Sequence, residues 1–312
     1  MKSVIVTGAT GVTGNGLVRY LLGKKIEVFA ILRPNSQREC NLPQDSLLHR
    51  IECNLGEYDQ ILQHHLIPPK KARVFFHLAW EGSKGREKVD NRNNMQLQSR
   101  NITYLMDAVE LCHKLECPVF LGVGSQAEYG YSNGWMNEDT VLQPGNGYGM
   151  AKVCACSMSR VLCKSYQIKH IWARLFSIYG PYDETHSLVD LSIQKLRKGE
   201  SLAYTTGEQL WNYLYSQDAG KALYLLSEYG QDGEEYCVAS AKARPLKDYI
   251  KEIHRIVNPN VEPEFGTTAK EEPGMQVDIS KLVQATKFQE EFTFQEGIAK
   301  IRDFYVEKES AK

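Results

Sequence analysis

No apolar segment of this sequence approaches the ~18 residues that a membrane-spanning helix needs. No excess of charge of either sign is present, because 37 Lys and Arg residues stand against 38 Asp and Glu residues, for a net charge of −1. Such a balance gives no general attraction to nucleic acid or to an anionic membrane. The N-terminal apolar stretch is too short for the core of a signal peptide. We therefore expect a cytoplasmic protein that binds neither nucleic acid nor membrane.

Patterns typical of disulfides and of metal sites are absent as well. None of the 8 cysteines forms a CxxC pair, and none of the 8 histidines belongs to an HxxxH or HExxH motif. Cys154 and Cys156 are close in a predicted helix, but their spacing places them on different helix faces. We expect reduced thiols and no metal site.

What the sequence does contain is an alternation of short apolar runs and longer amphipathic segments. Its composition, 42% hydrophobic and 24% charged, is that of a globular protein, and 312 residues suffice for two modest domains. Alternating strands and helices predict right-handed crossovers and a parallel sheet covered on both faces. The predicted strands are 4–7, 26–32, 51–53, 74–78, 119–123 and 170–176. The predicted helices after the first are 58–66, 94–115 and 148–166, with the shorter helices 187–198 and 246–257 in the second half.

A glycine-rich turn follows the first predicted strand. Residues 7–14, TGATGVTG, place Gly8, Gly11 and Gly14 between that strand and the first predicted helix. Gly8 permits a tight turn, Gly11 lets backbone N–H groups approach a pyrophosphate, and Gly14 allows close packing of helix on strand. In this position the turn indicates a dinucleotide-binding site.

The end of the second predicted strand bears on the choice of cofactor. An acidic side chain there accepts hydrogen bonds from the ribose 2′-OH of NAD, whereas an arginine pairs with the 2′-phosphate of NADP. The strand ends in Leu32, Arg33 and Pro34, without an acid. Arg33 therefore favours NADP, while NAD stays possible because arginine is also a common surface residue at a strand end.

A tyrosine and a lysine are spaced for one helix face. Tyr148 and Lys152 are four residues apart, and a lysine charge beside a phenol lowers its pKa from about 10. Such a tyrosine transfers a proton at a carbonyl or an alcohol. Tyr20 and Lys24 match the same pattern, but they lie at the far end of the first helix. Tyr148 instead follows Ser125, which comes just after the strand 119–123, where α/β sheets place their sites.

Together these segments resemble the extended short-chain dehydrogenase/reductase family of nucleotide-sugar epimerases, dehydratases and reductases. The resemblance implies a Rossmann-type doubly wound sheet, residues 1–178 with part of 212–240, and a smaller mixed substrate lobe, 179–211 and 241–312. It also implies a nucleotide-sugar substrate. It runs over nearly the whole chain and rests on TGATGVTG (7–14), HLAW (77–80), GSQAEYG (124–130), YGMAK (148–152), RLFSIYGP (174–181) and DISKLVQATKF (278–288).

The resemblance assigns roles to individual residues. Ser125 hydrogen-bonds the reacting sugar oxygen, Tyr148 is the acid/base, and Lys152 holds the nicotinamide ribose and tunes Tyr148. Asn54 and Leu55 approach the adenine, and Ser177 and Ile178 flank the nicotinamide amide. The expected cofactor-binding residues are Thr7, Gly8, Thr10, Gly11, Val12, Gly14, Arg33, Asn54, Leu55, Leu78, Ala79, Trp80, Tyr148, Lys152, Ser177 and Ile178.

Departures from the family pattern narrow the reaction. Gln126 and Ala127 stand where the family's 4,6-dehydratases carry an Asp-Glu pair, and Ala127 stands where its epimerase-reductases carry a cysteine. NADPH-dependent reduction of a nucleotide-linked 4-keto-6-deoxyhexose at C4 is the expected function, by likeness to the CDP-abequose-type reductases. An NAD-dependent nucleotide-sugar 4-epimerase is the first alternative. A non-catalytic NADP-sensing protein is the second, but it would not need an intact Ser125, Tyr148 and Lys152.

Two further expectations concern the substrate and the assembly. An arginine that the family often places before a late aspartate is missing ahead of Asp218, and Trp211 is a candidate to stack on the nucleobase. A homodimer is expected through the helices 94–115 and 148–166. Candidates to replace the missing arginine are Lys195, Arg197, Lys198 and Arg244, and the apolar residues expected at the dimer interface are Leu97, Tyr104, Leu105, Cys112, Met158, Val161 and Leu162.

Overall fold

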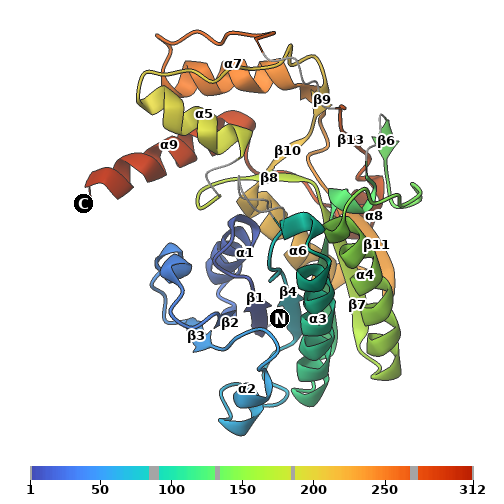
Figure 1. Ribbon diagram of the computed structural model, residues 1–312. Coiled ribbons are helices and arrows are strands. Elements are labelled where there is room, and N and C mark those ends of the chain that lie inside the picture. Colours follow the sequence, from blue (N-terminus) through green and yellow to red (C-terminus); the bar gives the residue numbers. More distant parts are fainter. Residues whose placement is uncertain (1, 84–90, 131–133, 184–186, 268–272, 311–312) are drawn as a thin grey trace.

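Seven parallel strands form the central sheet of the structure, a computed structural model that describes residues 2–83, 91–130, 134–183, 187–267 and 273–310 (Figure 1). Their order is β11-β7-β5-β4-β1-β2-β3, and every neighbouring pair is parallel. This confirms the predicted doubly wound α/β fold. The strands are β1 (Ser3–Thr7), β2 (Glu27–Leu32), β3 (Leu48–Glu52), β4 (Val74–His77), β5 (Val119–Ser125), β7 (Lys169–Leu175) and β11 (Glu234–Val238).

The inner strands are apolar runs because helices cover both faces of the sheet. β1 is buried along its whole length, for example, and pairs with β2 and β4 on its two sides. β3 begins earlier than the predicted strand 51–53, because Leu48 already pairs with Val28 of β2. The polar residues of β3 gave no apolar signal for this first half. Ser125, expected just beyond a strand, is the last residue of β5.

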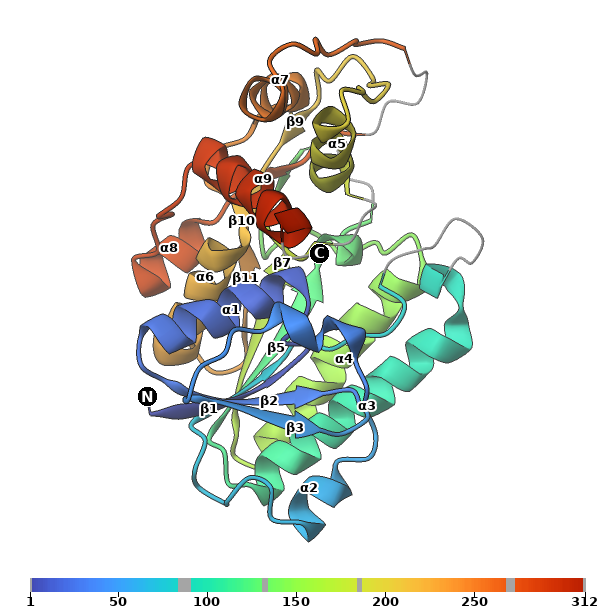
Figure 2. The same cartoon turned by 90° about the vertical axis from the view of Figure 1, so that its left-hand side faces the viewer.

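Two layers of helices sandwich the sheet, and Figure 2 shows them on its opposite faces. The side chain of Asn94 accepts a hydrogen bond from the N–H of Leu97 and so caps α3, and Asn146 caps α4 through the N–H of Gly149. These caps explain why the two long helices begin within a residue of their predicted starts. One layer contains α1 (Val12–Gly23), α6 (Ser216–Tyr229) and α8 (Ser280–Thr286), and the other contains α2 (Asp59–Gln63), α3 (Met95–Lys114) and α4 (Gly147–Ser165).

A smaller lobe lies beyond one edge of the sheet, at the top of Figure 1. Its core contains Tyr179, Tyr215, Tyr249 and Phe294. Within the range expected for this lobe, Met275 and other apolar residues up to Phe288 pack instead into the core beneath α1 and α6. The lobe helices are α5 (Leu188–Arg197), α7 (Leu246–Val257) and α9 (Phe294–Ser310), and the short paired strands are β8 (Ser177–Tyr179) with β10 (Tyr213–Tyr215), β9 (Leu210–Trp211) with β12 (Arg244–Pro245), and β6 (Trp135–Met136) with β13 (Gln276–Val277).

Three short 3₁₀ turns lie within the described residues. The turns are η1 (Gln37–Asn41), η2 (Asn91–Asn93) and η3 (Gln126–Glu128). All 8 cysteines are free thiols. Within the described ranges, no helix is long and apolar enough to cross a membrane, and no group of three His, Cys, Asp or Glu side chains could hold a metal ion.

Because the strands are parallel, their carboxyl ends meet along one edge of the sheet, the edge that faces the lobe. Thr7, Leu32, His77, Ser125 and Leu175 are the last residues of β1, β2, β4, β5 and β7. Ligands of doubly wound sheets bind at this edge, where the strand order reverses. The fold therefore directs the search for a site to the loops that follow these strands.

Candidate active site

A cavity of about 1010 Å³ opens along this edge, between the sheet and the lobe. Among the predicted catalytic and cofactor-binding residues, Thr7 alone does not line it. The Thr7 hydroxyl is buried beneath the glycine-rich turn, where it bonds Nδ1 of His77 at 3.1 Å and accepts the N–H of Ala79. The predicted residues that line the cavity are Gly8, Thr10, Gly11, Val12, Gly14, Arg33, Asn54, Leu55, Leu78, Ala79, Trp80, Ser125, Tyr148, Lys152, Ser177 and Ile178.

The glycine-rich turn is shaped by close backbone contacts. Gly8 has φ +71°, and a Cβ there would lie 2.7 Å from the nitrogen of Ala79 in the loop after β4. A Cβ on Gly14 would collide with the carbonyl oxygen of Gly8. At Gly11 the nearest atom would be 3.5 Å away, so packing inside the protein does not require a glycine there. Space in front of Gly11 is what a ligand lying against this backbone needs.

The start of α1 fits the phosphates of a dinucleotide. The helix begins at Val12 beside the cavity, and its N-cap, Gly11, offers no side chain to the first amides. No acidic residue lies in the first turn. Unpaired N–H groups at a helix start, with no carboxylate to compete for them, bind anions well. The residues present therefore fit the cofactor that the sequence predicted.

Positive side chains line the cavity beyond β2. Arg33 lines it as predicted, together with Ser36, just before η1, and Arg38 of η1. Arg38 also donates a hydrogen bond to the carbonyl oxygen of Tyr182 at 3.2 Å. Sequence reasoning missed Arg38, because only the fold of the loop after β2 returns it to the cavity. Asn54 lines the same end and donates a hydrogen bond to Glu57 at 3.0 Å.

Ser125 and Tyr148 meet at the middle of the cavity. A Cβ on Gly149 would collide with the carbonyl oxygen of Ala127, so the start of α4 lies directly against η3. This contact sets Tyr148, which is 9% exposed, beside Ser125 at the end of β5. Burial raises the pKa of Tyr148, whereas a hydrogen bond from Ser125 and the charge of Arg92 act to lower it.

Lys152 is almost completely enclosed, with 3% of its side chain exposed. Its Nζ donates a hydrogen bond to the carbonyl oxygen of Val123 at 2.6 Å and lies 3.8 Å from the centre of the Trp80 ring. The Tyr148 ring centre is farther away, at 5.9 Å. Burial lowers the pKa of Lys152, and the negative charge of Glu128 acts against that shift.

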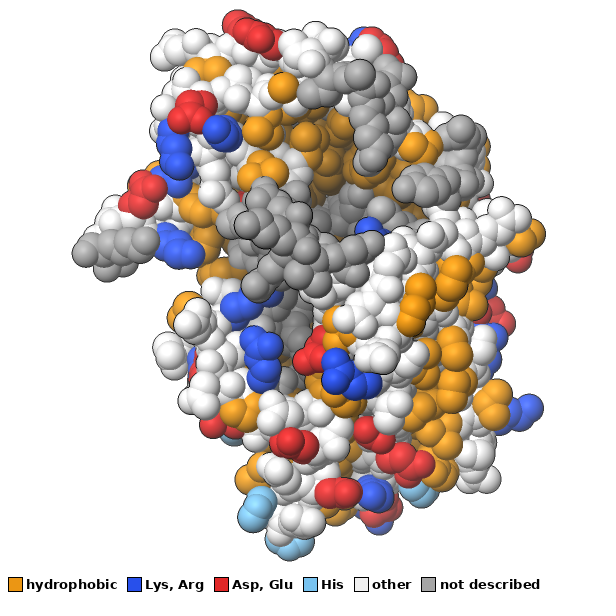
Figure 3. Space-filling view, in the orientation of Figure 1, with side chains coloured by type: hydrophobic (Ala, Val, Ile, Leu, Met, Phe, Trp, Pro, Cys, Tyr) orange, Lys and Arg blue, Asp and Glu red, His pale blue; other side chains and the backbone are white. Residues whose placement is uncertain are grey.

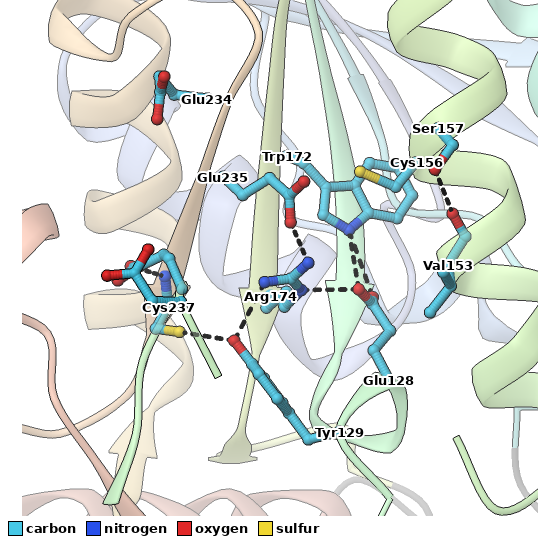
Figure 4. Close-up of polar contacts among 12 residues, drawn as sticks. Glu128, Tyr129, Val153, Cys156, Ser157, Trp172, Arg174, Glu234, Glu235 and Cys237 are labelled. Atoms are coloured by element: carbon cyan, nitrogen blue, oxygen red, sulfur yellow. Dashed lines mark hydrogen bonds and ion pairs between the residues drawn. The ribbon is translucent and has the colours of Figure 1, made fainter. Parts of the chain in front are cut away.

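A buried network of charges lies directly beneath Ser125. Glu128, 0% exposed, accepts the N–H of Ser125 at 2.8 Å and forms an ion pair with Nε of Arg174 at 2.7 Å. Figure 4 shows Arg174 between Glu128 and Glu235, with the indole N–H of Trp172 directed at Glu128. Burial would lower the pKa of Arg174, but attraction to Glu128 raises it. No local pattern predicted this network, since its members are far apart along the chain.

The lobe contributes aromatic side chains rather than the expected cations. Trp211 and Tyr213 line the cavity. None of the cations considered as replacements for the missing arginine lines the cavity: Lys195, Arg197, Lys198 and Arg244. Three of them form ion pairs elsewhere, Lys195 with Glu200, Arg197 with Glu309 and Arg244 with Glu252. One arginine not singled out from the sequence, Arg92 of η2, does line it.

Comparison with known proteins identifies the family of the chain. The pattern that defines the NAD dependent epimerase/dehydratase family matches residues 4–239. The chain belongs to this family. Its members are the nucleotide-sugar enzymes of the extended short-chain dehydrogenase/reductase type, so the predicted resemblance and the prediction of an enzyme are confirmed. The finer likeness to CDP-abequose-type reductases stays a prediction.

Curated relatives of this epimerase/dehydratase chain are named dTDP-glucose 4,6-dehydratase. One from Xanthomonas campestris pv. campestris is 26% identical over 60% of this chain and 57% of its own length. One from Escherichia coli K12 is 26% identical over 54% and 50%. The chain thus spans little more than half the length of these two, whereas one from Haemophilus influenzae is 22% identical over 98% of both chains.

Solved structures share the fold. A UDP-N-acetylglucosamine 4-epimerase from Methanobrevibacter ruminantium superimposes with a TM-score of 0.85, 22% identity and coverage of 98% of this chain and 99% of the other. A UDP-glucuronic acid 4-epimerase from Bacillus cereus, in complex with NAD, gives a TM-score of 0.81 at 20% identity, with 98% and 99% coverage. At these identities the likeness establishes the architecture.

The buried network generates a stability prediction. Glu128→Gln keeps the size of the side chain but leaves Arg174 with a neutral neighbour, so we expect the free energy of unfolding in urea to fall by about 3–5 kcal/mol. Glu116→Gln, which breaks the exposed ion pair with Lys70, is the control and should change it by less than about 1 kcal/mol. Equal effects of the two substitutions would contradict the role given to Glu128.

Proposed function

We propose that this epimerase/dehydratase family member reduces the C4 carbonyl of a nucleotide-linked 4-keto-6-deoxyhexose with NADPH. The observation that carries the proposal is the placement of Ser125 and Tyr148 together in the cavity, where Gln126 and Ala127 stand in the positions of an acid pair. Gln126 and Ala127 transfer no proton. Glu128 does not replace the missing acid, because its carboxylate is buried and bonded to Ser125 N–H, Trp172 and Arg174.

Gln126 and Ala127 distinguish the chain from the dehydratases that it is similar to. Elimination of water from a sugar needs an acid and a base placed at neighbouring carbons. Ser125 and Tyr148 together serve one oxygen only. A reaction at a single carbinol or keto carbon is therefore what this site supports, in spite of the names of the curated relatives.

The proposed mechanism uses three side chains of the chain itself. When bound, NADPH supplies the hydride that reduces C4. Tyr148 donates its phenolic proton to the carbonyl oxygen as negative charge develops there, and Ser125 donates a hydrogen bond to the same oxygen. Lys152, held near Trp80 and Tyr148, would bind the nicotinamide ribose and, in its protonated form, stabilise negative charge on Tyr148.

An NAD-dependent 4-epimerase is the second candidate. The same tyrosine and serine serve an epimerase, which removes a proton from the C4 hydroxyl and later returns one. Solved structures named as 4-epimerases, one of them in complex with NAD, share the fold over 98% of this chain. Arg33 and Arg38 at the ribose end favour the NADPH-dependent reductase of the two.

The roles assigned to Tyr148 and Ser125 predict unequal losses of activity when each residue is replaced. Tyr148→Phe should bind cofactor normally but lose most turnover, because it lacks the transferable proton. The turnover of Ser125→Ala should fall about 10²–10³-fold, the usual effect of removing one oxyanion donor. Tyr20→Phe, in the second tyrosine-lysine pair, is the control and should remain active. NADPH oxidation with a panel of nucleotide 4-keto-6-deoxyhexoses provides the measurement, and full activity of Tyr148→Phe would overturn the assignment.

The cofactor assignment is tested by binding. Arg33→Ala removes a charge-assisted contact that NADPH makes and NADH does not, worth about 1.5–3 kcal/mol. We expect the Kd for NADPH to rise at least tenfold and the Kd for NADH to stay within about twofold. Arg255→Ala, an exposed arginine on α7, should change neither. An equal loss for both cofactors in a fluorescence titration would rule out a 2′-phosphate contact.

We also propose a homodimer through α3 and α4. Its apolar surface differs from the expected one, because Leu105 and Cys112 are buried against the sheet and Tyr104 lines the cavity. The exposed apolar stripe runs instead along α4 and consists of Met150, Cys154, Met158 and Val161. Figure 3 shows hydrophobic side chains gathered over this part of the molecule. The spacing of the stripe suits helix-on-helix burial by a second copy.

Light scattering tests the dimer. The chain should have the mass of a dimer at micromolar concentration, and Val161→Glu, which places a charge on the stripe, should have the mass of a monomer. Val141→Glu is the control, because Val141 is equally exposed, at 72%, but lies outside α3 and α4. A monomeric wild-type chain, or a dimer that tolerates Val161→Glu, would contradict the proposed interface.

A further inference from the structure

Arg92 occupies a position in the cavity that the mechanism above leaves without a task. Its Cζ lies 5.0 Å from the centre of the Tyr148 ring, on the side of the phenol that faces η2. Its Nε is buried and has no hydrogen-bond partner among the described residues. A buried donor without an acceptor costs stability, whereas the remainder of the guanidinium is half-buried and lines the cavity, where a ligand oxygen can accept a hydrogen bond from it.

The backbone around Arg92 is fixed to the two helices that frame the site. Asn93 accepts the N–H of Gly147, at the start of α4, through its side-chain oxygen at 3.1 Å. Gln98 of α3 donates from its side chain to the carbonyl oxygen of Asn91 at 2.8 Å. A Cβ on Gly147 would lie 3.0 Å from the carbonyl oxygen of Arg92. The position of the arginine over Tyr148 is therefore set by its own segment, independently of any ligand.

The charged groups near Tyr148 come from three different elements. Arg92 of η2 is positive and acts to lower the pKa of the phenol, while Glu128 of η3 is negative and acts to raise it. Lys152 of α4 lies 5.9 Å from the ring centre, farther than Arg92. Among the residues that the structure describes, Arg92 is thus the cation nearest to the phenol ring, a place that sequence reasoning gave to Lys152.

We propose that Arg92 is a further substrate-binding residue, whose guanidinium lines the cavity beside Tyr148 and donates a hydrogen bond to an oxygen substituent of the sugar ring next to the reacting carbon. The inference rests on the proposed function, which places the sugar oxygen at Tyr148. In a hexopyranose, C4 and C1 lie on opposite sides of the ring. A group over Tyr148 therefore meets the sugar near C4 and not the diphosphate attached at C1.

Calorimetry of two ligands separates the sugar from the diphosphate. Arg92→Gln should leave the Kd for a nucleoside diphosphate within about twofold of wild type. The additional affinity of the matching nucleotide hexose should fall about tenfold or more, as expected for one charged hydrogen bond. Arg73→Gln, an exposed arginine at the opposite edge of the sheet just before β4, is the control and should change neither Kd. An equal loss for both ligands, or no loss for either, would overturn the proposal.

A second readout does not depend on the sugar. The phenolate of Tyr148 can be followed by absorbance, as the difference between each protein and the same protein with Tyr148→Phe. Without the cation the phenolate is less stable, so Arg92→Gln should move the titration midpoint to higher pH, by about one unit. Arg92→Lys keeps the charge, so its titration midpoint should lie close to that of the wild-type chain. Its affinity for the sugar should remain low.

These outcomes distinguish the inference from the function on which it rests. If the wild-type chain binds no nucleotide hexose, the proposed function fails. A midpoint that is the same in Arg92→Gln and in the wild-type chain would contradict the placement of Arg92 at Tyr148, whatever the substrate proves to be.

Discussion

The ion pair between Glu128 and Arg174 holds the end of β5 in place, and the positions of the other active-site residues depend on it. Arg174 lies in β7 and Glu128 in the turn after β5, and both are almost completely buried. Two charges brought out of water are stable only with good geometry and further hydrogen bonds. Ser125 N–H, the Trp172 indole and Glu235 supply those bonds. The end of β5, and with it the hydroxyl of Ser125, is thereby held against the neighbouring strand.

Contacts with the end of β5 position the other residues of the active site. η3 begins at Gln126, and the carbonyl oxygen of Ala127 within it meets Gly149 of α4, which leaves no room for a side chain there. α4 therefore presents Tyr148 to Ser125 and directs Lys152 one helical turn later beneath Trp80. Burial in this wall disfavours a charged phenol, and Ser125 and Arg92 oppose that effect. A tyrosine balanced in this way is suited to give a proton and to take it back.

Local patterns predicted much of the fold and part of the site. The apolar runs predicted most of the strands of the sheet, and the glycines of residues 7–14 indicated the turn against which a ligand can lie. The short paired strands of the lobe were missed, because two or three residues give no period. Leu105 and Cys112 were assigned to the wrong helix face, since periodicity alone does not tell which apolar stripe of α3 meets the sheet. Arg38, Arg92 and the partners of Glu128 were missed because only the folded chain brings them to the cavity.

Transfer of deuterium tests the proposed reaction most directly. The chain is incubated with a nucleotide 4-keto-6-deoxyhexose and NADPH that carries deuterium on its transferable position, and the sugar is analysed by mass spectrometry. The reductase account predicts one deuterium at C4 of the product for each NADPH consumed. Recovery of the 4-keto sugar without deuterium and with NADPH unchanged, together with conversion of the matching 4-hydroxy nucleotide sugar into its C4 epimer without added NADPH, would contradict the account and identify an epimerase.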